Sequence, residues 1–274
     1  MKSLATYKND ICLVAGSGDF VYEAAIYLNQ NKRLSKIILI SQNYKLKKKF
    51  KSIIFEKDIR NLELIIKHIK KESLINVLIL GYVKLPPINK IKLSLKSKLQ
   101  LSKNFFLNNI NDQSLILKKF LKSKNINLLS QKKTFKDLLI SKIDNTVKNK
   151  HIKIQKNINS DINYIKRIFS LNLSQSLIMN GNRIIALEDI NGTDDLIKRI
   201  GNTKIEFNNL IFIKGKKSKQ IDEIDFPVIG EETLNLLIKY NFKAICLFNN
   251  QVIASNKNIF IDKIKKSNLS LIVL

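Results

Sequence analysis

The sequence predicts an α/β protein with a Rossmann-like parallel-sheet N-terminal domain and a second α/β domain at the C-terminus. Short apolar runs alternate with segments of helical periodicity through the first half of the chain. This β-α-β-α-β order is typical of a parallel sheet covered by helices on both faces. The length of 274 residues, with 45% hydrophobic residues, suffices for two modest domains with real cores.

The first half supplies the elements of the predicted N-terminal domain, residues 1–130. Buried strands are expected where short apolar runs end in glycine or a polar residue, and helices where apolar residues recur every three or four positions. The expected strands are 11–16, 36–41 and 75–83, and the expected helices are 20–28, 58–70, 90–101 and 112–123.

The second half is predicted to form a connecting region, 131–160, and a C-terminal α/β domain, 161–274. The connecting region is polar and Lys-rich, so we expect a short helix or strand there at most. Asn180-Gly181-Asn182 predicts a hairpin turn between two short strands. Further helices are expected at 161–173, 193–200, 230–240 and 258–266, and strands at 209–213, 243–248 and 269–274.

The net charge of +27 suggests nucleic-acid or membrane partners, but its make-up disfavours the first. Only five of the 49 basic residues are Arg, the residue that nucleic-acid readers favour for bidentate contacts. No apolar run approaches the length of a membrane span, and the N-terminus lacks a signal-peptide pattern. We therefore expect a cytoplasmic protein, with peripheral contact with the anionic inner membrane left open.

The positions of the cysteines and histidines limit which metal sites and disulfides the chain could form. Cys12 and Cys246 lie in apolar runs, which predicts buried thiols rather than a disulfide or a metal site. His68 and His151 lie in separate Lys-rich segments, so a His-built zinc site is not expected. Oxygen ligands are the remaining option for a metal ion.

A Gly-x-Gly turn from Gly16 to Gly18 separates the first predicted strand from the first helix. Such a turn lets backbone amides approach a phosphate. It is not a full dinucleotide fingerprint, because Val21 stands at the third glycine position and no acidic residue ends the second strand. A tight strand–helix turn capped by Asp19 explains the pattern equally well.

Four carboxylates lie within eight residues of the segment LEDINGTDDLIKRI, 187–200. Thr193 is a candidate helix cap, and the two aspartates after it would complement the helix dipole. Glu188 and Asp189 are not explained in this way. The four carboxylates could instead hold a hard cation such as Mg²⁺, so capping and metal or substrate binding both stay open.

A second acidic island, IDEIDFPVIGEET at 221–233, contains five carboxylates and no base. Pro227 restricts Phe226 to extended conformations, which displays Asp225 from a stiff strand or turn. The helix dipole explains the two glutamates after Gly230 but not the three acids before the proline. A fixed carboxylate at a strand–helix junction suits a metal ligand or a general base.

Several motifs, in this order and spacing, resemble the UDP-2,3-diacylglucosamine diphosphatase family of lipid A biosynthesis, in its mainly alphaproteobacterial form. That family is unrelated in fold to the calcineurin-like hydrolases of the same step. The resemblance covers nearly the whole chain and rests on LVAGSGDF near the start, GYVKLPPI, NDQSLILKKF, ALEDINGTDDLIKRI and KKSKQIDEIDFPVIGEET.

The resemblance implies Mg²⁺-dependent hydrolysis of a lipid-linked UDP-sugar, held between two domains, by water attack on the α-phosphorus. The implied products are UMP and 2,3-diacylglucosamine 1-phosphate, and a homodimer is implied. Asp225 matches the family's catalytic aspartate. The other implied positions are Gly16, Gly18, Asp112, Thr193, Gln220, Gly230 and Thr233 for substrate, and Asp225, Glu188 and Asp194 for the metal.

The chain departs from the family pattern at Ser17, Val21, Leu85, Gln113, Asn191 and Ser218. Two other functions remain as alternatives to the diphosphatase. One is another Rossmann-type nucleotide-binding enzyme, such as an oxidoreductase, which NAD(P)H binding would reveal. The other is a non-catalytic basic nucleic-acid-binding protein, which would bind DNA or RNA in a salt-sensitive manner and would tolerate Asp225→Ala.

Overall fold

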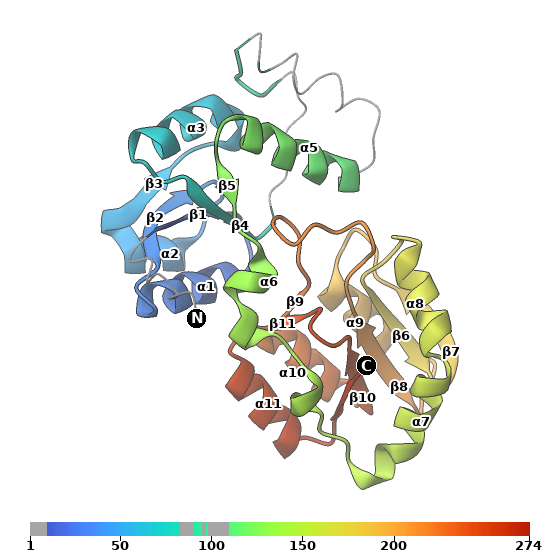
Figure 1. Ribbon diagram of the computed structural model, residues 1–274. Coiled ribbons are helices and arrows are strands. Elements are labelled where there is room, and N and C mark those ends of the chain that lie inside the picture. The colour runs from blue at the N-terminus through green and yellow to red at the C-terminus, as the bar shows by residue number, and fades with distance from the viewer. Residues whose placement is uncertain (1–9, 83–89, 95–96, 98–109) are drawn as a thin grey trace, which may run out of the picture. The chain divides into compact units, whose positions relative to one another are not determined.

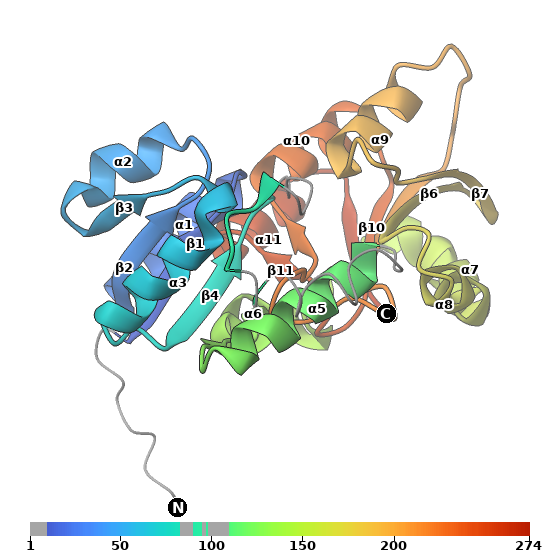
Figure 2. The ribbon, with the colours of Figure 1, turned by 90° about the horizontal axis from the view of Figure 1, so that it is seen from above.

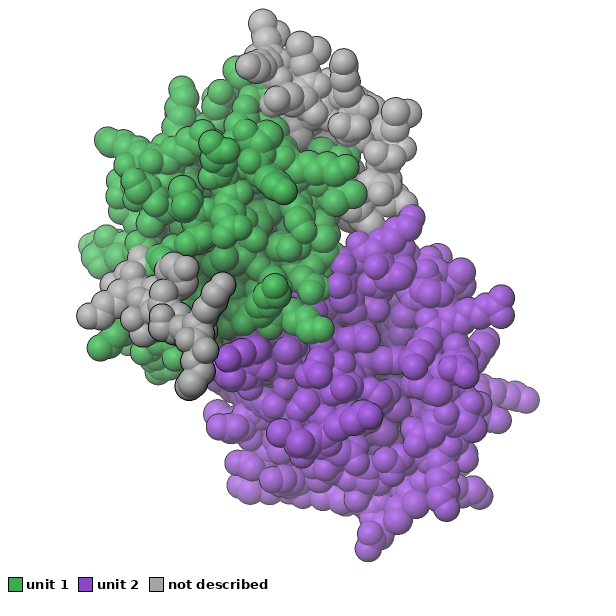
Figure 3. Space-filling view, viewed as in Figure 1, with its two compact units in different colours: residues 1–134, 221–225 green, residues 135–220, 226–274 purple. Residues whose placement is uncertain are grey.

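The structure is a computed structural model that describes residues 10–82, 90–94, 97 and 110–274, and side chains from residue 114 onward in the last of these ranges. The chain forms two compact units (Figure 3). The first comprises Met1–Thr134 and Ile221–Asp225, and the second Phe135–Gln220 and Phe226–Leu274. These units interleave along the chain, whereas the predicted domains are contiguous. The boundaries 1–130, 131–160 and 161–274 therefore remain a prediction.

The first unit is built on a five-stranded parallel sheet, as the alternating pattern predicts (Figure 1). Its order, β3-β2-β1-β4-β5, places β1 and β4 side by side at the centre, where the strand order reverses. The three expected strands are confirmed. The bounds are β1 Ile11–Ala15, β2 Leu34–Leu39, β3 Ile54–Glu56, β4 Asn76–Leu80 and β5 Asn127–Leu128.

Helices cover both faces of this sheet (Figures 1 and 2). α3 (Leu62–Lys71) and α5 (Ile110–Ser123) share a buried core with β1 and β4. α1 (Asp19–Gln30) and α2 (Tyr44–Phe50) lie on the opposite face, and a short α6 (Gln131–Thr134) follows β5. Half of the helix expected at 90–101 lies outside the described residues, and the described residues 91–94 are not helical.

The second unit holds a mixed five-stranded sheet of order β12-β10-β8-β6-β7. β8, β10 and β12 are parallel, β6 pairs antiparallel with β8, and β7 pairs antiparallel with β6 at the edge of the sheet. Gly181 takes a φ of +61° in the hairpin turn, which confirms the Asn-Gly prediction. The bounds are β6 Ser176–Asn180, β7 Arg183–Leu187, β8 Leu210–Lys214, β10 Ala244–Leu247 and β12 Ser270–Val273.

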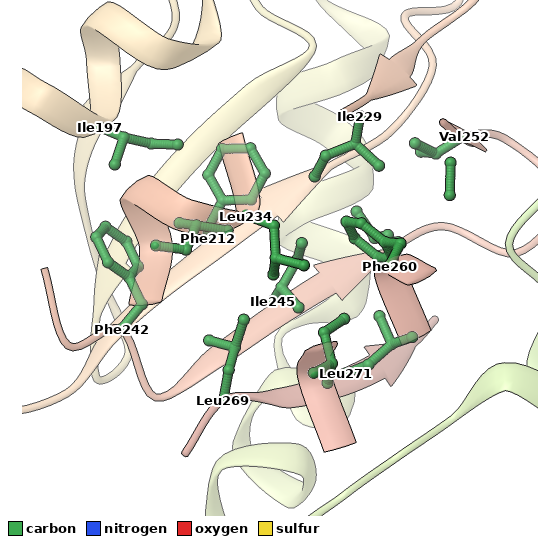
Figure 4. Packing of buried hydrophobic residues seen from close by; sticks show 14 of the residues in the cluster. Ile197, Phe212, Ile229, Leu234, Phe242, Ile245, Val252, Phe260, Leu269 and Leu271 are labelled. Atoms are coloured by element: carbon green, nitrogen blue, oxygen red, sulfur yellow. The ribbon is translucent and has the colours of Figure 1, made fainter. Parts of the chain in front are cut away.

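Two layers of helices enclose this second sheet (Figure 1). α9 (Thr193–Gly201), α10 (Glu231–Lys239) and α11 (Lys257–Lys266) pack on one face, where Phe212, Ile245 and Leu271 meet helix residues such as Leu234 (Figure 4). α7 (Ile152–Ser160) and α8 (Ile162–Ser170) pack on the other. The short β9 (Val228–Ile229) and β11 (Ile253–Ala254) pair separately.

The segment 131–160 carries more structure than its sequence predicts. Besides α6 and three short 3-10 turns it contains the nine-residue α7, whose Ile158 is fully buried against the second sheet. The polar composition hid this helix because only a narrow apolar stripe is needed to dock it.

Both cysteines are free and fully buried, as predicted. Burial raises the pKa of Cys12 to about 12, despite an opposing effect of Lys36, and burial also raises the pKa of Cys246. These thiols are therefore unreactive packing residues. Within the described residues, no helix is long and apolar enough to cross a membrane.

Candidate active site

A buried lysine lies at the centre of the polar side chains in the second unit. Lys214 ends β8, and its side chain is only 2% exposed. Antiparallel pairing places Ser176 of β6 directly opposite. The Lys214 Nζ donates to Ser176 Oγ at 3.0 Å and to Thr193 Oγ1 at 2.8 Å. Burial of an ammonium group is unfavourable unless it is hydrogen-bonded and paired with a negative charge. The side chains around Lys214 supply these partners.

The partner charge is Glu188, which follows β7 and whose side chain is 10% exposed. Its Oε2 accepts a hydrogen bond from Thr193 Oγ1 at 2.9 Å and lies 3.7 Å from Lys214 Nζ. Burial alone raises the pKa of the Glu188 carboxyl, but Lys214 and hydrogen bonds from neighbouring side chains outweigh it and lower the pKa. The carboxylate is thus ionised at neutral pH.

Two glutamines extend the network. Gln175 Nε2 donates to Glu188 Oε1 at 3.2 Å, and Gln175 Oε1 accepts from Gln220 Nε2 at 2.8 Å. Gln220 is buried, and its Oε1 accepts from the Lys217 amide at 2.8 Å. The predicted site residue Gln220 is therefore joined to Glu188 through one side chain. We call Lys214, Glu188, Thr193, Ser176, Gln175 and Gln220 the Lys214 network.

The network reaches the first turns of α9 and α10. Thr193 is the first residue of α9 rather than its cap, which corrects the capping interpretation, because Gly192 occupies the N-cap position. Thr233, near the start of α10, donates to Asp194 Oδ1. Gly230 is the N-cap of α10, and neither helix has a side-chain cap. The structure thus brings Glu188, Thr193, Asp194, Gln220, Gly230 and Thr233 to one edge of the second unit, beside the carboxyl end of β8.

The acidic island at 187–200 does not form a single carboxylate cluster. Asp189 and Asp195 both pair with Arg199, at 2.9 and 3.1 Å, on the surface. Glu188 faces Lys214 and Asp194 faces Thr233. Among the residues that the structure describes, no group of three or more His, Cys, Asp or Glu could hold a metal ion. A metal bound here would therefore need oxygen atoms from outside this chain segment.

Asp225 belongs to the other compact unit. It is exposed and follows a turn at 222–224, and its amide donates to the Ile221 carbonyl at 3.0 Å. Within the first unit, Glu223 pairs with Lys118 of α5 at 3.0 Å, and the Asp222 carbonyl accepts from the Gln131 amide at 2.7 Å. These contacts hold Ile221–Asp225, which we call the acidic strip, on the first unit.

The Gly-x-Gly turn lies at the carboxyl end of β1, beside β4. The Ser17 and Tyr82 backbones exchange hydrogen bonds of 3.0 and 2.8 Å, which tie the two loops together. Gly18 is the N-cap of α1, and no side chain caps this helix, which corrects the interpretation of Asp19 as a cap. Gly81 has a φ of +84°, and a Cβ there would lie 2.5 Å from Ser17 O.

Sequence reasoning missed Lys214, Ser176 and Gln175. A lysine that ends a fully apolar strand is an unusual signal, but it is hard to notice in a chain with 49 Lys and Arg residues. Asp112 lies in α5, with its side chain outside the described residues, and Leu85 lies outside them altogether.

Comparison with known proteins agrees with this two-unit architecture. The chain matches the model of the LpxI N-terminal domain over residues 10–138 and that of the LpxI C-terminal domain over residues 144–272. No match was found among curated proteins. LpxI domains correspond to UDP-2,3-diacylglucosamine pyrophosphatase, a hydrolase of a diphosphate bond in lipid A synthesis. Since the two models together span nearly the whole chain, this protein belongs to the LpxI family.

Proposed function

We propose that this LpxI-family hydrolase, of the mainly alphaproteobacterial form, uses Mg²⁺ and directs water to the α-phosphorus of UDP-2,3-diacylglucosamine. A bond forms between the water oxygen and the α-phosphorus, and the bond from that phosphorus to the bridging oxygen breaks. The sugar phosphate leaves with the bridging oxygen, so the products are UMP and 2,3-diacylglucosamine 1-phosphate. The Lys214 network is the observation that carries this proposal.

The network supports phosphoryl chemistry because it fixes charge before the substrate arrives. Preorganised charges and dipoles stabilise a phosphoryl transition state without the cost of reorganising water. Lys214 is too buried to touch substrate in this arrangement. We assign it a positioning role, in which it holds Thr193 at the start of α9 and keeps Glu188 ionised.

Asp194 of the second unit and Asp225 of the first are each a candidate Mg²⁺ ligand, as the family resemblance implies. The contacts of Glu188 disfavour the ligand role predicted for it, because Lys214 already supplies its positive charge. The other acids in the first turns of α9 and α10 pair with basic residues, whereas Asp194 accepts a hydrogen bond from Thr233. Mg²⁺ commonly takes one or two protein carboxylates and completes its shell with water and substrate phosphate oxygens. Mg²⁺ would neutralise charge on the diphosphate.

Gly230 supports close approach of a ligand to the start of α10. Its φ of −112° is open to any residue, and no atom lies within 4 Å of the position a Cβ would take. The N-cap position favours glycine modestly, but neither backbone conformation nor packing within the described residues requires it. Close approach of a bound substrate to this backbone would require it.

The proposal is tested by measuring UMP release from UDP-2,3-diacylglucosamine. We expect turnover with Mg²⁺, loss of turnover in EDTA and recovery when Mg²⁺ is restored. Asp225→Ala and Asp194→Asn should each lower kcat by at least about a hundredfold, as expected for groups that handle metal or proton. Asp262→Asn, on the exposed surface of α11, is the matched control. An active Asp225→Ala variant would overturn the assignment of that residue.

The bond that breaks is tested separately in H₂¹⁸O. Attack on the α-phosphorus places the heavy oxygen in UMP, whereas attack on the β-phosphorus places it in the sugar phosphate. Mass spectrometry of both products distinguishes the two. Label in the sugar phosphate would overturn the proposed point of attack while leaving the hydrolase activity intact.

We also propose a cytoplasmic homodimer that touches the anionic membrane surface peripherally. The charge of +27 supports the membrane contact, because each surface lysine contributes attraction to acidic lipids. The family resemblance supports the dimer. Light scattering should give twice the 31.6 kDa chain mass. Cosedimentation with phosphatidylglycerol vesicles should weaken as salt rises.

A further inference from the structure

A second polar site lies in the second unit at the opposite edge of the sheet from the Lys214 network. A pocket of about 830 Å³ opens there, at the amino ends of β8, β10 and β12. Lys150, His151, Lys153, Lys243 and Lys266 contribute to its lining, and none of its lining residues in the described part of the chain is acidic. We call it the basic pocket.

Among the residues that the structure describes, no acidic side chain forms an ion pair with a lysine of this pocket. Lys150 donates to the side-chain amide of Asn268 rather than to a carboxylate. His151 is buried, with its Nδ1 2.8 Å from Ser270 Oγ. Burial lowers the pKa of His151 most, and Lys150, Lys243 and Lys148 lower it further, while no nearby acid raises it. Within the described part of the chain, the positive charge of this pocket is therefore not balanced by a neighbouring acid.

Three lysines elsewhere in the unit do have acidic partners. Lys198 pairs with Glu232, Lys257 with Asp144 and Lys263 with Glu231. In the basic pocket, by contrast, four lysines and His151 line one hollow, and no described lining residue carries the opposite charge. The volume falls in the range of small-ligand sites, and several ammonium groups around one hollow are suited to phosphate oxygens.

We propose that the basic pocket binds a phosphate-bearing anion at a site separate from the catalytic one. The recognised chemistry is a phosphate or diphosphate group, presented either by a free small molecule or by the headgroup of an acidic lipid. The proposal does not depend on the mechanism inferred for the Lys214 network, because the two sets of residues lie at opposite edges of the sheet.

The two histidines provide a direct readout in the full-length protein. Imidazole NMR titrations follow His151 in the pocket, and His68 in the first unit serves as an internal control. We expect methylenediphosphonate, which resists hydrolysis, to raise the pKa of His151 and to leave that of His68 unchanged, because a bound anion stabilises the charged ring. Unchanged titration of His151 with this probe and with every other probe would overturn the proposal.

Paired variants test whether the pocket lysines act specifically. Lys150→Gln/Lys243→Gln should weaken binding of methylenediphosphonate at least about tenfold, since charge-assisted hydrogen bonds are lost. Lys166→Gln/Lys204→Gln removes the same charge from exposed positions of the same unit and should leave binding unchanged. Equal weakening by both pairs would mean non-specific attraction and would refute the site. The wild-type His151 shift remains informative if a variant folds poorly.

A second set of probes distinguishes the two sources of phosphate. Phosphatidylglycerol vesicles, compared with phosphatidylcholine vesicles and with inorganic phosphate, present the group on a membrane or in solution. A His151 shift with phosphatidylglycerol alone assigns the pocket to a lipid headgroup, and one with the soluble anions alone assigns it to a small molecule. Either result supports the shared chemistry.

Discussion

In each unit a polar segment follows a parallel strand, but different interactions hold the two segments in place. After β1, the Gly16–Gly18 turn is held by backbone hydrogen bonds to Tyr82 and carries little charge. After β8, the corresponding edge is held by side chains around the buried Lys214. The first arrangement depends on backbone shape, and the second depends on charge balance. The two should therefore respond to different substitutions.

Removal of the charge balance should have the largest effect. Lys214→Met leaves Glu188 buried without its cation and should lower the free energy of unfolding by about 3–5 kcal/mol. Urea denaturation measures this. The double variant Lys214→Met/Glu188→Leu removes both charges and should recover more than half of the loss, while UMP release stays low in both. If the double variant is no more stable than the single one, the pair is not coupled as described.

The next largest loss of stability is expected when a glycine of the first unit loses its backbone freedom. Gly81→Ala adds a Cβ that would lie 2.5 Å from both Ser17 O and Val21 Cγ2, at a φ of +84°. We expect a loss of about 2–3 kcal/mol from strain and clash together. Gly181→Ala is the control, because its φ is also positive but its surroundings are open. It should cost only about 1 kcal/mol. Equal losses would mean that close packing at Gly81 is unimportant.

The free energy of unfolding should depend on pH through Glu188, in the charged network of the second unit. The pKa of Glu188 is lowered in the folded protein, so its stabilisation is complete above the unfolded value of about 4.3 and is lost as pH falls through the folded pKa. The difference in unfolding free energy between wild type and Glu188→Gln should therefore shrink on acidification below that range. A constant difference down to low pH would contradict the ionised carboxylate.

The smallest effect on stability is expected at Gly230. Gly230→Ala meets open space at an ordinary φ, so it should cost less than about 1 kcal/mol. If the substrate approaches this backbone, KM should rise several-fold while the melting temperature hardly changes. Steady-state kinetics and thermal unfolding of the same variant provide the two measurements. An unchanged KM would leave the glycine without a substrate-binding role.

The sequence predicted the strands and helices whose apolar pattern was strong, and missed those that are short or polar. Strands β3, β5, β9 and β11 have only two or three residues and lack a readable period. α7 was masked by its polar composition. Both kinds of element form because neighbouring segments offer a surface, which a local pattern does not record.

The candidate site was predicted only in part for a similar reason. Motif positions located Glu188, Thr193, Gln220 and Thr233, and the structure joins them through hydrogen bonds. Lys214 could not be singled out, since its importance lies in burial and in contacts with residues 21 to 38 positions away. The four carboxylates at 187–200 do not gather into one cluster, because Arg199 pairs with Asp189 and Asp195 on the surface.

The interleaved assignment of the acidic strip constrains how the chain can be recombined. Gln131 and Lys118 contact Asp222 and Glu223 of the strip within the first unit, although these partners follow them by 91 and 105 positions along the sequence. A single crossover between two family genes after residue 134 would join one parent's Gln131 and Lys118 to the other parent's strip. Only an exchange with breakpoints on both sides of 221–225 keeps the matched pieces together. The gene for this fold should therefore tolerate shuffling poorly, even though its product consists of two compact units.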